Sequence, residues 1–214
     1  MSARLLKPLI LWLSAGGIVA VALVIFPPFR IVCLSETRQA VKTFDPSEYA
    51  ADFWQNKLTA SFASASDAAE VLQAIRSDRR AAKERYGRVV GAGGPHHYYV
   101  RGSGRIIAIR DRYVDLALTD EGEIDLVLMI AKIVGNEVLN ATAIVTPSQF
   151  ARTSDYNGVS AAINQIVEGD LVPAFLAKAN VGDKLHFVGC SKRVQDDDPV
   201  PVPLQVVPVK LEIE

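Results

Sequence analysis

The side chains that most often carry catalysis are few in this chain of 214 residues. It has three histidines and no Gly-x-Ser-x-Gly sequence of the kind that presents a nucleophilic serine. His96 and His97 are adjacent in a predicted strand, so they point to opposite faces and one metal ion cannot take both. His186 alternates with apolar neighbours, which is typical of a structural or solvent-facing position. The sequence therefore predicts no catalytic, cofactor-binding or metal-binding residue, and it favours a protein that is not an enzyme.

Two further stretches contain residues typical of ligand sites but lack the necessary spacing. Residues 91–95, Gly-Ala-Gly-Gly-Pro, lack the third glycine of a dinucleotide fingerprint and the Gly-Lys-Ser/Thr of a P-loop, so they predict a flexible turn. The aspartates 196–198 are consecutive, whereas calcium loops place their ligands at alternate positions, and this run favours a solvated turn. An active site built from carboxylates that converge from distant positions in the chain is an open alternative, and the protein would then be an envelope hydrolase.

The balance of charges argues against nucleic acid as a partner. The chain has 23 basic and 24 acidic residues, a formal net charge of -1, and 7% aromatic residues. Nucleic-acid-binding surfaces need excess positive charge and aromatic side chains for stacking. A basic run extends from Arg76 to Arg85, but Asp78 and Glu84 offset it. It therefore predicts a solvated helix face, with a patch for an anionic partner as the alternative.

The N-terminus has the features of a membrane anchor. Arg4 and Lys7 precede an uncharged run, whose core Leu9–Phe26 has 18 residues. A bilayer needs about 20 apolar residues, and a secretory signal usually has about 7–15. Bulky residues after the run offer no good cleavage site, and the basic flank favours a cytoplasmic N-terminus. Residues 1–30 therefore predict an uncleaved signal anchor, a single transmembrane helix of the bacterial inner membrane with a periplasmic C-terminal domain; a cleaved secretory protein and a buried core helix are the alternatives.

The two cysteines, Cys33 and Cys190, are too few for a disulfide framework or a zinc ribbon. Cys33 follows Arg30-Ile31-Val32, whereas a lipid-modified cysteine normally follows a small residue. We interpret Cys33 as a juxtamembrane thiol. A disulfide between Cys33 and Cys190 is an open alternative in an oxidising compartment.

The elements that would position any site centre on residues 104–130, which predict three consecutive strands. Residues 105–110 are rich in β-branched side chains, and Tyr113–Leu118 alternates apolar and polar residues. A turn at residues 120–122 follows, with Gly122 free to take positive φ. The run Ile124–Ile133 is almost wholly apolar and predicts a long buried strand, with a buried helix as the competing interpretation.

A helical segment precedes these strands. Asp45 and Pro46 are typical of a helix start, with Glu48 completing a capping box. The apolar stripe of this first helix continues to Leu58. Two shorter helices are predicted after it, at residues 67–77 with Ser66 as the cap and at residues 78–86.

The C-terminal half adds a further extended piece, a helical region and two strands. Residues 138–145 predict a strand. Ser154 or Asp155 is expected to cap a helix to residue 168, and a separate helix is expected at residues 171–179. Strands are predicted at 184–190 and 204–213, and Pro208 places the last one at an edge or a bulge.

This order, three strands, a helix and two strands, is the β-β-β-α-β-β order of an OB-like barrel. The predicted fold class is α+β, with a five-stranded OB-like β-barrel after a helical segment and a transmembrane or signal-anchor helix. The predicted organisation is an anchor over residues 1–30, a linker over 31–43, a helical lead-in over 44–87 and the OB-like domain over 88–214.

Several short motifs resemble the predicted periplasmic lipoprotein family known as domain of unknown function 2291. They are the N-terminal apolar run with Arg30-Ile31-Val32, Phe44-Asp45-Pro46 through Trp54, Tyr86-Gly87, Gly104–Ile107, Phe150–Asn164 and Val181-Gly182-Asp183. Phe29 stands where the family commonly has its lipid-attachment cysteine, and Arg152-Thr153 replaces the polar pair expected before the helix. Within the Phe150 stretch, Phe150, Tyr156 and Asn164 match the family.

The resemblance implies an envelope protein linked with ABC-type sugar uptake, and it supplies no catalytic residues. Together with the predicted anchor, it leads us to expect a membrane-tethered, non-enzymatic module that binds a ligand or a partner. The expected partners are the membrane itself, through the N-terminal helix, and an ABC transporter component or a periplasmic binding protein.

Overall fold

The computed structural model describes residues 44–89, 95–119, 122–192 and 203–214. Residues 45–214 form one compact unit. The predicted anchor, the linker, Cys33 and the aspartates 196–198 lie outside the described residues. Within the described ranges, none of the helices combines the length and the apolar character needed to cross a bilayer.

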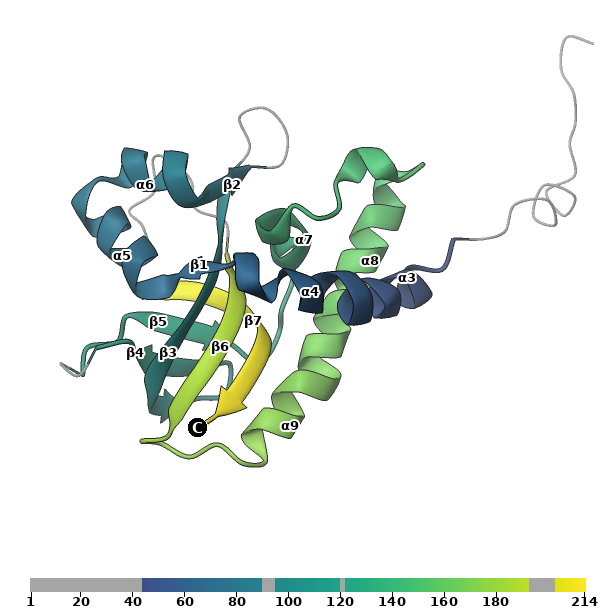
Figure 1. Cartoon of the computed structure of the whole chain (residues 1–214). Coiled ribbons are helices and arrows are strands. Elements are labelled where there is room, and N and C mark those ends of the chain that lie inside the picture. Colours follow the sequence, from purple (N-terminus) through teal and green to yellow (C-terminus); the bar gives the residue numbers. More distant parts are fainter. Residues whose placement is uncertain (1–43, 90–94, 120–121, 193–202) are drawn as a thin grey trace, which may run out of the picture. The chain divides into compact units, whose positions relative to one another are not determined.

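Five strands pair in a closed cycle, and their order along the chain is the predicted one (Figure 1). Strand β3 pairs with β4 and β6, β5 pairs with β4 and β7, and β7 also pairs with β6. All of these pairings are antiparallel except that of β5 with β7, which is parallel. The bounds are His96–Ile109 for β3, Tyr113–Ala117 for β4, Leu126–Met129 for β5, Lys184–Ser191 for β6 and Leu204–Ile213 for β7.

The interior of this ring is packed with branched aliphatic side chains. Each stabilises the fold by about 1.5–3 kcal/mol when fully buried. Fully buried examples from all five strands are Ile106, Leu116, Leu128, Leu185 and Val206. Pro208 lies where the β6–β7 register shifts, so the predicted bulge is confirmed.

Two expectations for the middle of the chain change. The run from residue 124 to 133 does contain a strand, not a helix, but β5 ends at Met129. Beyond it the backbone turns through Lys132 at φ 56° and Gly135 at φ 105°, conformations that end an extended strand. The predicted strand at residues 138–145 is wrong, because Glu137–Thr142 forms helix α7.

The helical lead-in is confirmed, with changes in detail. Helix α3 begins at Pro46, and the Asp45 carboxylate accepts hydrogen bonds from the backbone N–H groups of residues 47 and 48. Asp67, not Ser66, caps α5, since its carboxylate accepts from the N–H groups of residues 69 and 70. Two short strands that pair with β3 were not predicted. The elements are α3 (Pro46–Asp52), the π-helical η1 (Phe53–Leu58), α4 (Thr59–Ser61), η2 (Phe62–Ser64), β1 (Ser66–Asp67), α5 (Ala68–Ser77), α6 (Arg79–Tyr86) and β2 (Gly87–Val89).

The two helices expected between β5 and β6 are one continuous helical rod. A short 3-10 turn, η3 (Pro147–Gln149), precedes it. Neither Ser154 nor Asp155 caps the rod, which begins at Thr153 without a side-chain cap. Helix α3 packs against it closely, because a Cβ on Gly158 would lie 2.9 Å from the Pro46 ring. The rod consists of α8 (Thr153–Ile166), the π-helical η4 (Val167–Leu171) and α9 (Val172–Leu176).

Candidate functional site

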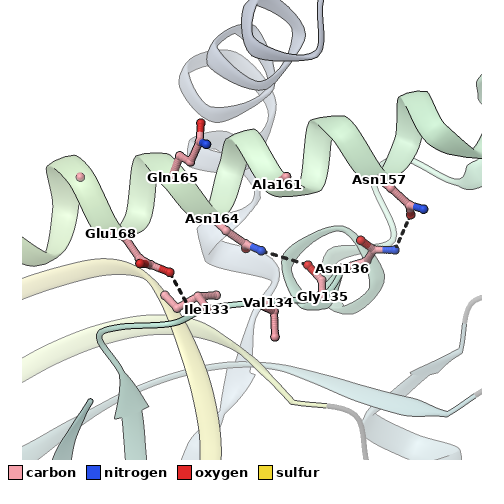
Figure 2. A pocket seen from close by; sticks show the side chains of 10 residues that line it. Ile133, Val134, Gly135, Asn136, Asn157, Ala161, Asn164, Gln165 and Glu168 are labelled. Carbon is pink, nitrogen blue, oxygen red and sulfur yellow. Dashed lines mark hydrogen bonds between the residues drawn. The ribbon is translucent and has the colours of Figure 1, made fainter. Parts of the chain in front are cut away.

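A groove of about 780 Å³ lies between the helical rod and the loop that follows β5 (Figure 2). We call it the clasp groove. Side-chain amides supply much of its polar lining, and Val134 supplies an exposed apolar edge. The lining residues are Ile133, Val134, Gly135, Asn136, Asn157, Ala161, Asn164, Gln165, Glu168 and Gly169.

Four hydrogen bonds tie the loop to the rod, and together we call them the clasp. Asn136 Nδ2 donates to Asn157 Oδ1 at 3.1 Å. The carbonyl of Gly135 accepts from Ser160 Oγ at 2.9 Å and from Asn164 Nδ2 at 3.1 Å. The backbone N–H of residue 133 donates to the Glu168 carboxylate at 2.6 Å.

The helix side of the clasp lies along one face of the rod. Residues 157, 160, 164 and 168 recur every three or four positions, which places them on one side of a helix. Figure 2 shows Asn157, Asn164 and Glu168 pointing from the rod toward the loop. The clasp therefore ties the loop to the rod by polar contacts along one face of the rod.

The clasp holds a strained backbone. A non-glycine residue at positive φ, as at Lys132, costs on the order of 1–3 kcal/mol, and such strain persists only where the surroundings enforce it. The loop that is held this way projects Val134, which is 69% exposed. The arrangement presents an apolar side chain beside an amide-lined groove.

A buried polar relay lies on another side of α8. Tyr156 donates its hydroxyl hydrogen to Asn140 Oδ1 at 2.8 Å. The Asn140 amide lies 3.3 Å from His97 Nε2, and His97 Nδ1 lies 3.2 Å from the carbonyl oxygen of Ser191. This geometry suits a neutral His97 with its proton on Nδ1, because the amide donates to Nε2 and the carbonyl accepts from Nδ1. Burial raises the pKa of Tyr156 to about 12.

The relay is a structural element rather than a site. His97 is 2% exposed and Tyr156 is 2% exposed, so a ligand does not reach either side chain. Phe150 stacks edge-on against Tyr156, with ring centroids 5.6 Å apart, and so two of the three residues that matched the family pack together. The third, Asn164, belongs to the clasp.

His186 and Cys190 lie apart from the polar cluster at Tyr156. His186 is about half exposed, with Nε2 4.0 Å from the Glu214 carboxylate. Cys190 is fully buried, and this burial raises the pKa of its thiol. Across the described part of the chain, no three side chains of His, Cys, Asp or Glu gather as metal ligands.

Each of three buried aspartates forms an ion pair with a different arginine. The ion pairs are Arg110–Asp115 at 2.6 Å, Arg76–Asp125 at 2.8 Å and Arg152–Asp155 at 2.8 Å. All three carboxylates are therefore engaged in ion pairs with arginines. Arg152-Thr153, which replaces the family's polar pair, lies at the start of α8 and does not line the clasp groove.

Sequence reasoning missed the clasp residues. The helix at 154–168 is predicted from its cap candidates and the helical spacing of its apolar residues, whereas Asn157, Asn164 and Glu168 follow the same spacing on another face. That polar face was the available signal. Their partners are mainly backbone atoms of the loop, which no residue type reveals.

Comparison with known proteins supports the fold and the resemblance. No curated protein matches the chain. A crystal structure described as an OB-fold protein from Thermotoga maritima is similar, with a TM-score of 0.75 and 29% identity over 81% of this chain and 100% of that one. The family model of the predicted periplasmic lipoproteins matches residues 19–212, so this chain belongs to that family, domain of unknown function 2291.

Proposed function

We propose that this protein is a non-enzymatic binding module of the bacterial envelope, accessory to an ABC-type solute uptake system, with a sugar as the transported solute. In this proposal, residues 1–30 hold it in the inner membrane as a single span. The folded unit then stands on the periplasmic side, and the strand ring is an OB-like barrel. The family description and the apolar N-terminal run support this location.

The observation that carries the proposal is the clasp groove. Its lining has side-chain amides and one carboxylate, and the residues that line it include no serine, cysteine or histidine. Amides suit recognition by hydrogen bonds, and the single carboxylate of the lining, Glu168, accepts a hydrogen bond from the backbone N–H of residue 133 and has no second carboxylate beside it in the lining. The clasp also fixes Val134 beside the groove, which suits docking of a preformed partner surface.

The partner that we propose is a transporter component or a periplasmic binding protein. A photo-activated cross-linking residue at Val134 tests this in cells that produce the full chain. Val181 is the matched control, because it is also a valine and is 63% exposed against 69% for Val134.

The expected result is a discrete cross-linked product at position 134, which mass spectrometry identifies as a transport component, and no such product at position 181. Equal products at both positions would mean nonspecific collision, and a product of another protein class at position 134 would contradict the uptake role. Absence of any product at position 134 would remove the groove from the proposal.

A further inference from the structure

A second hollow, of about 400 Å³, lies between α3–η1 and the helical rod. We call it the tryptophan hollow. Its walls are mostly apolar, and its polar groups are the indole of Trp54, the amide of Gln55 and the carboxylate of Asp170. The lining residues are Ala51, Trp54, Gln55, Ile166, Asp170 and Leu171.

Two π-helical segments from different helices meet at this hollow. Trp54 and Gln55 belong to η1, and Asp170 and Leu171 belong to η4. π-helical turns are rare in proteins, well under 1% of residues, and they occur often at functional sites. Both π-helical segments contribute side chains to the lining of this hollow.

The two π-helical segments share a pattern of buried apolar residues. Phe53 and Leu58 are five residues apart and both fully buried, and Val167 and Val172 repeat this spacing with 0% and 3% exposure. Residues five apart lie on different faces of an α-helix, which has 3.6 residues per turn. The wider turns bury both apolar pairs, while Trp54, Gln55 and Asp170 of the same segments line the hollow.

The charge of the hollow is negative. Asp170 is its one ionisable side chain, and within the described ranges its carboxylate has no hydrogen bond or ion pair. The nearest lysine in sequence to Trp54 is Lys57, whose Nζ lies 5.3 Å from the centroid of the Tyr49 ring rather than at Asp170. An anionic ligand would therefore meet repulsion here.

An unpaired carboxylate beside an indole is the combination that recognises organic cations. Tryptophan is the best aromatic partner for an ammonium or guanidinium group, and the attraction grows when the site is partly desolvated. Ile166 and Leu171 add apolar contact for the carbon atoms of such a ligand. We propose that the tryptophan hollow binds an organic cation, either a free amine or a lysine or arginine side chain of a partner.

The test uses the full chain in detergent with Trp12→Phe, which leaves Trp54 as the single tryptophan of a chain that has two. The probe is tetramethylammonium chloride, followed by the fluorescence of Trp54. Sodium chloride controls for ionic strength, and tert-butanol is a neutral control of similar size. We expect a saturable change with tetramethylammonium and none with either control.

Two carboxylate variants decide whether Asp170 makes the site. Asp170→Asn should weaken binding by about fivefold or more, because the ionic attraction is lost while the shape is kept. Asp52→Asn is the matched control, since Asp52 is exposed on α3, hydrogen-bonded to Asn56 and absent from the lining. Equal affinity in both variants, or a response to tert-butanol equal to that for the cation, would overturn the proposal.

Two further probes distinguish the sources of the cation. N-acetyl-lysine methylamide presents a side chain as a protein would, and butylamine presents the same ammonium without a peptide. Tighter binding of the lysine derivative supports a partner's side chain, and tighter binding of butylamine or tetramethylammonium supports a free amine. Failure of all three probes to bind would overturn the cation site and would leave the proposed role of the clasp groove unaffected.

Discussion

The clasp groove and the tryptophan hollow are both lined by residues of η4, and the two carboxylates of this segment differ in their partners. In η4, Glu168 accepts a hydrogen bond from the backbone of residue 133 and helps to close the clasp. Asp170, two residues later, lines the tryptophan hollow without a partner within the described ranges. The comparison separates side chains that hold the fold from side chains that are available to a ligand.

The difference has an energetic meaning. A hydrogen bond within the protein contributes about 0.5–1.5 kcal/mol to stability, and removing one partner of a buried pair costs about 1–3 kcal/mol. A solvated carboxylate such as Asp170 contributes little to stability, so it can be substituted, or can bind a ligand, without lowering the free energy of unfolding. Substitutions on the clasp side should therefore change stability, and substitutions on the hollow side should not.

The largest effect is expected from Gly135→Ala, in the loop that the clasp holds. Gly135 has φ 105°, and an added Cβ would meet the Glu137 carboxylate. Strain at positive φ and overpacking together should lower the free energy of unfolding by about 2–4 kcal/mol. Denaturant unfolding monitored by circular dichroism measures this change.

Gly169→Ala is the matched control, because Gly169 also lines the clasp groove. No atom lies within 4 Å of a Cβ added there, and the residue lies in η4. Replacing a helical glycine by alanine should raise stability by about 0.5–1 kcal/mol. If Gly135→Ala proved as harmless as Gly169→Ala, the clasp would not be holding a strained loop.

A smaller effect is expected from Tyr156→Phe, which removes a satisfied buried group without enlarging the core. Loss of the hydrogen bond to Asn140 should cost about 1 kcal/mol at pH 7. Burial raises the pKa of Tyr156 from 10 in a free phenol to about 12, so the folded state keeps its proton between pH 10 and 12 while the unfolded state loses it. The contribution of Tyr156 to stability is therefore full below pH 10 and falls as pH rises through this window.

By pH 11 the tyrosine's contribution should have fallen by about 1.4 kcal/mol. The wild-type protein and Tyr156→Phe should then have similar stability, although the wild type is more stable at pH 7. Unfolding curves at pH 7, 9 and 11 measure the gap between the two proteins. A gap that is constant across these pH values would show that Tyr156 titrates as an exposed phenol.

The strand ring could be predicted from the sequence because its signal is local. Alternation in residues 113–118 indicated β4, and the predicted last strand has the same bounds as β7. The strand predicted at residues 138–145 is wrong because the apolar side chains there fit both the period of two of a strand and the period of 3.6 of a helix. Val138, Leu139, Ala141 and Thr142 are all buried together in a helix, a choice that is made by contacts with distant residues.

The candidate site was hidden for a different reason. The clasp joins side chains of the rod to backbone atoms of a loop more than 20 residues earlier in the chain, and backbone atoms carry no sequence signal. The π segments were also missed. The buried pairs Phe53–Leu58 and Val167–Val172 have a spacing of five, which a search at a period of 3.6 does not detect.

The smallest effect, and the most direct test of the comparison, is expected from Glu168→Gln set against Asp170→Asn. Both substitutions remove one negative charge from η4 and keep the shape of the side chain. Glu168→Gln should lower stability by about 1 kcal/mol, because a charge-assisted hydrogen bond to a backbone N–H becomes a neutral one. Asp170→Asn should change stability by less than about 0.5 kcal/mol.

Amide hydrogen exchange at residue 133 should speed up in Glu168→Gln alone, since this N–H donates the hydrogen bond to the Glu168 carboxylate. Equal exchange rates in the two variants would contradict the difference between Glu168, which stabilises the fold, and Asp170, which does not.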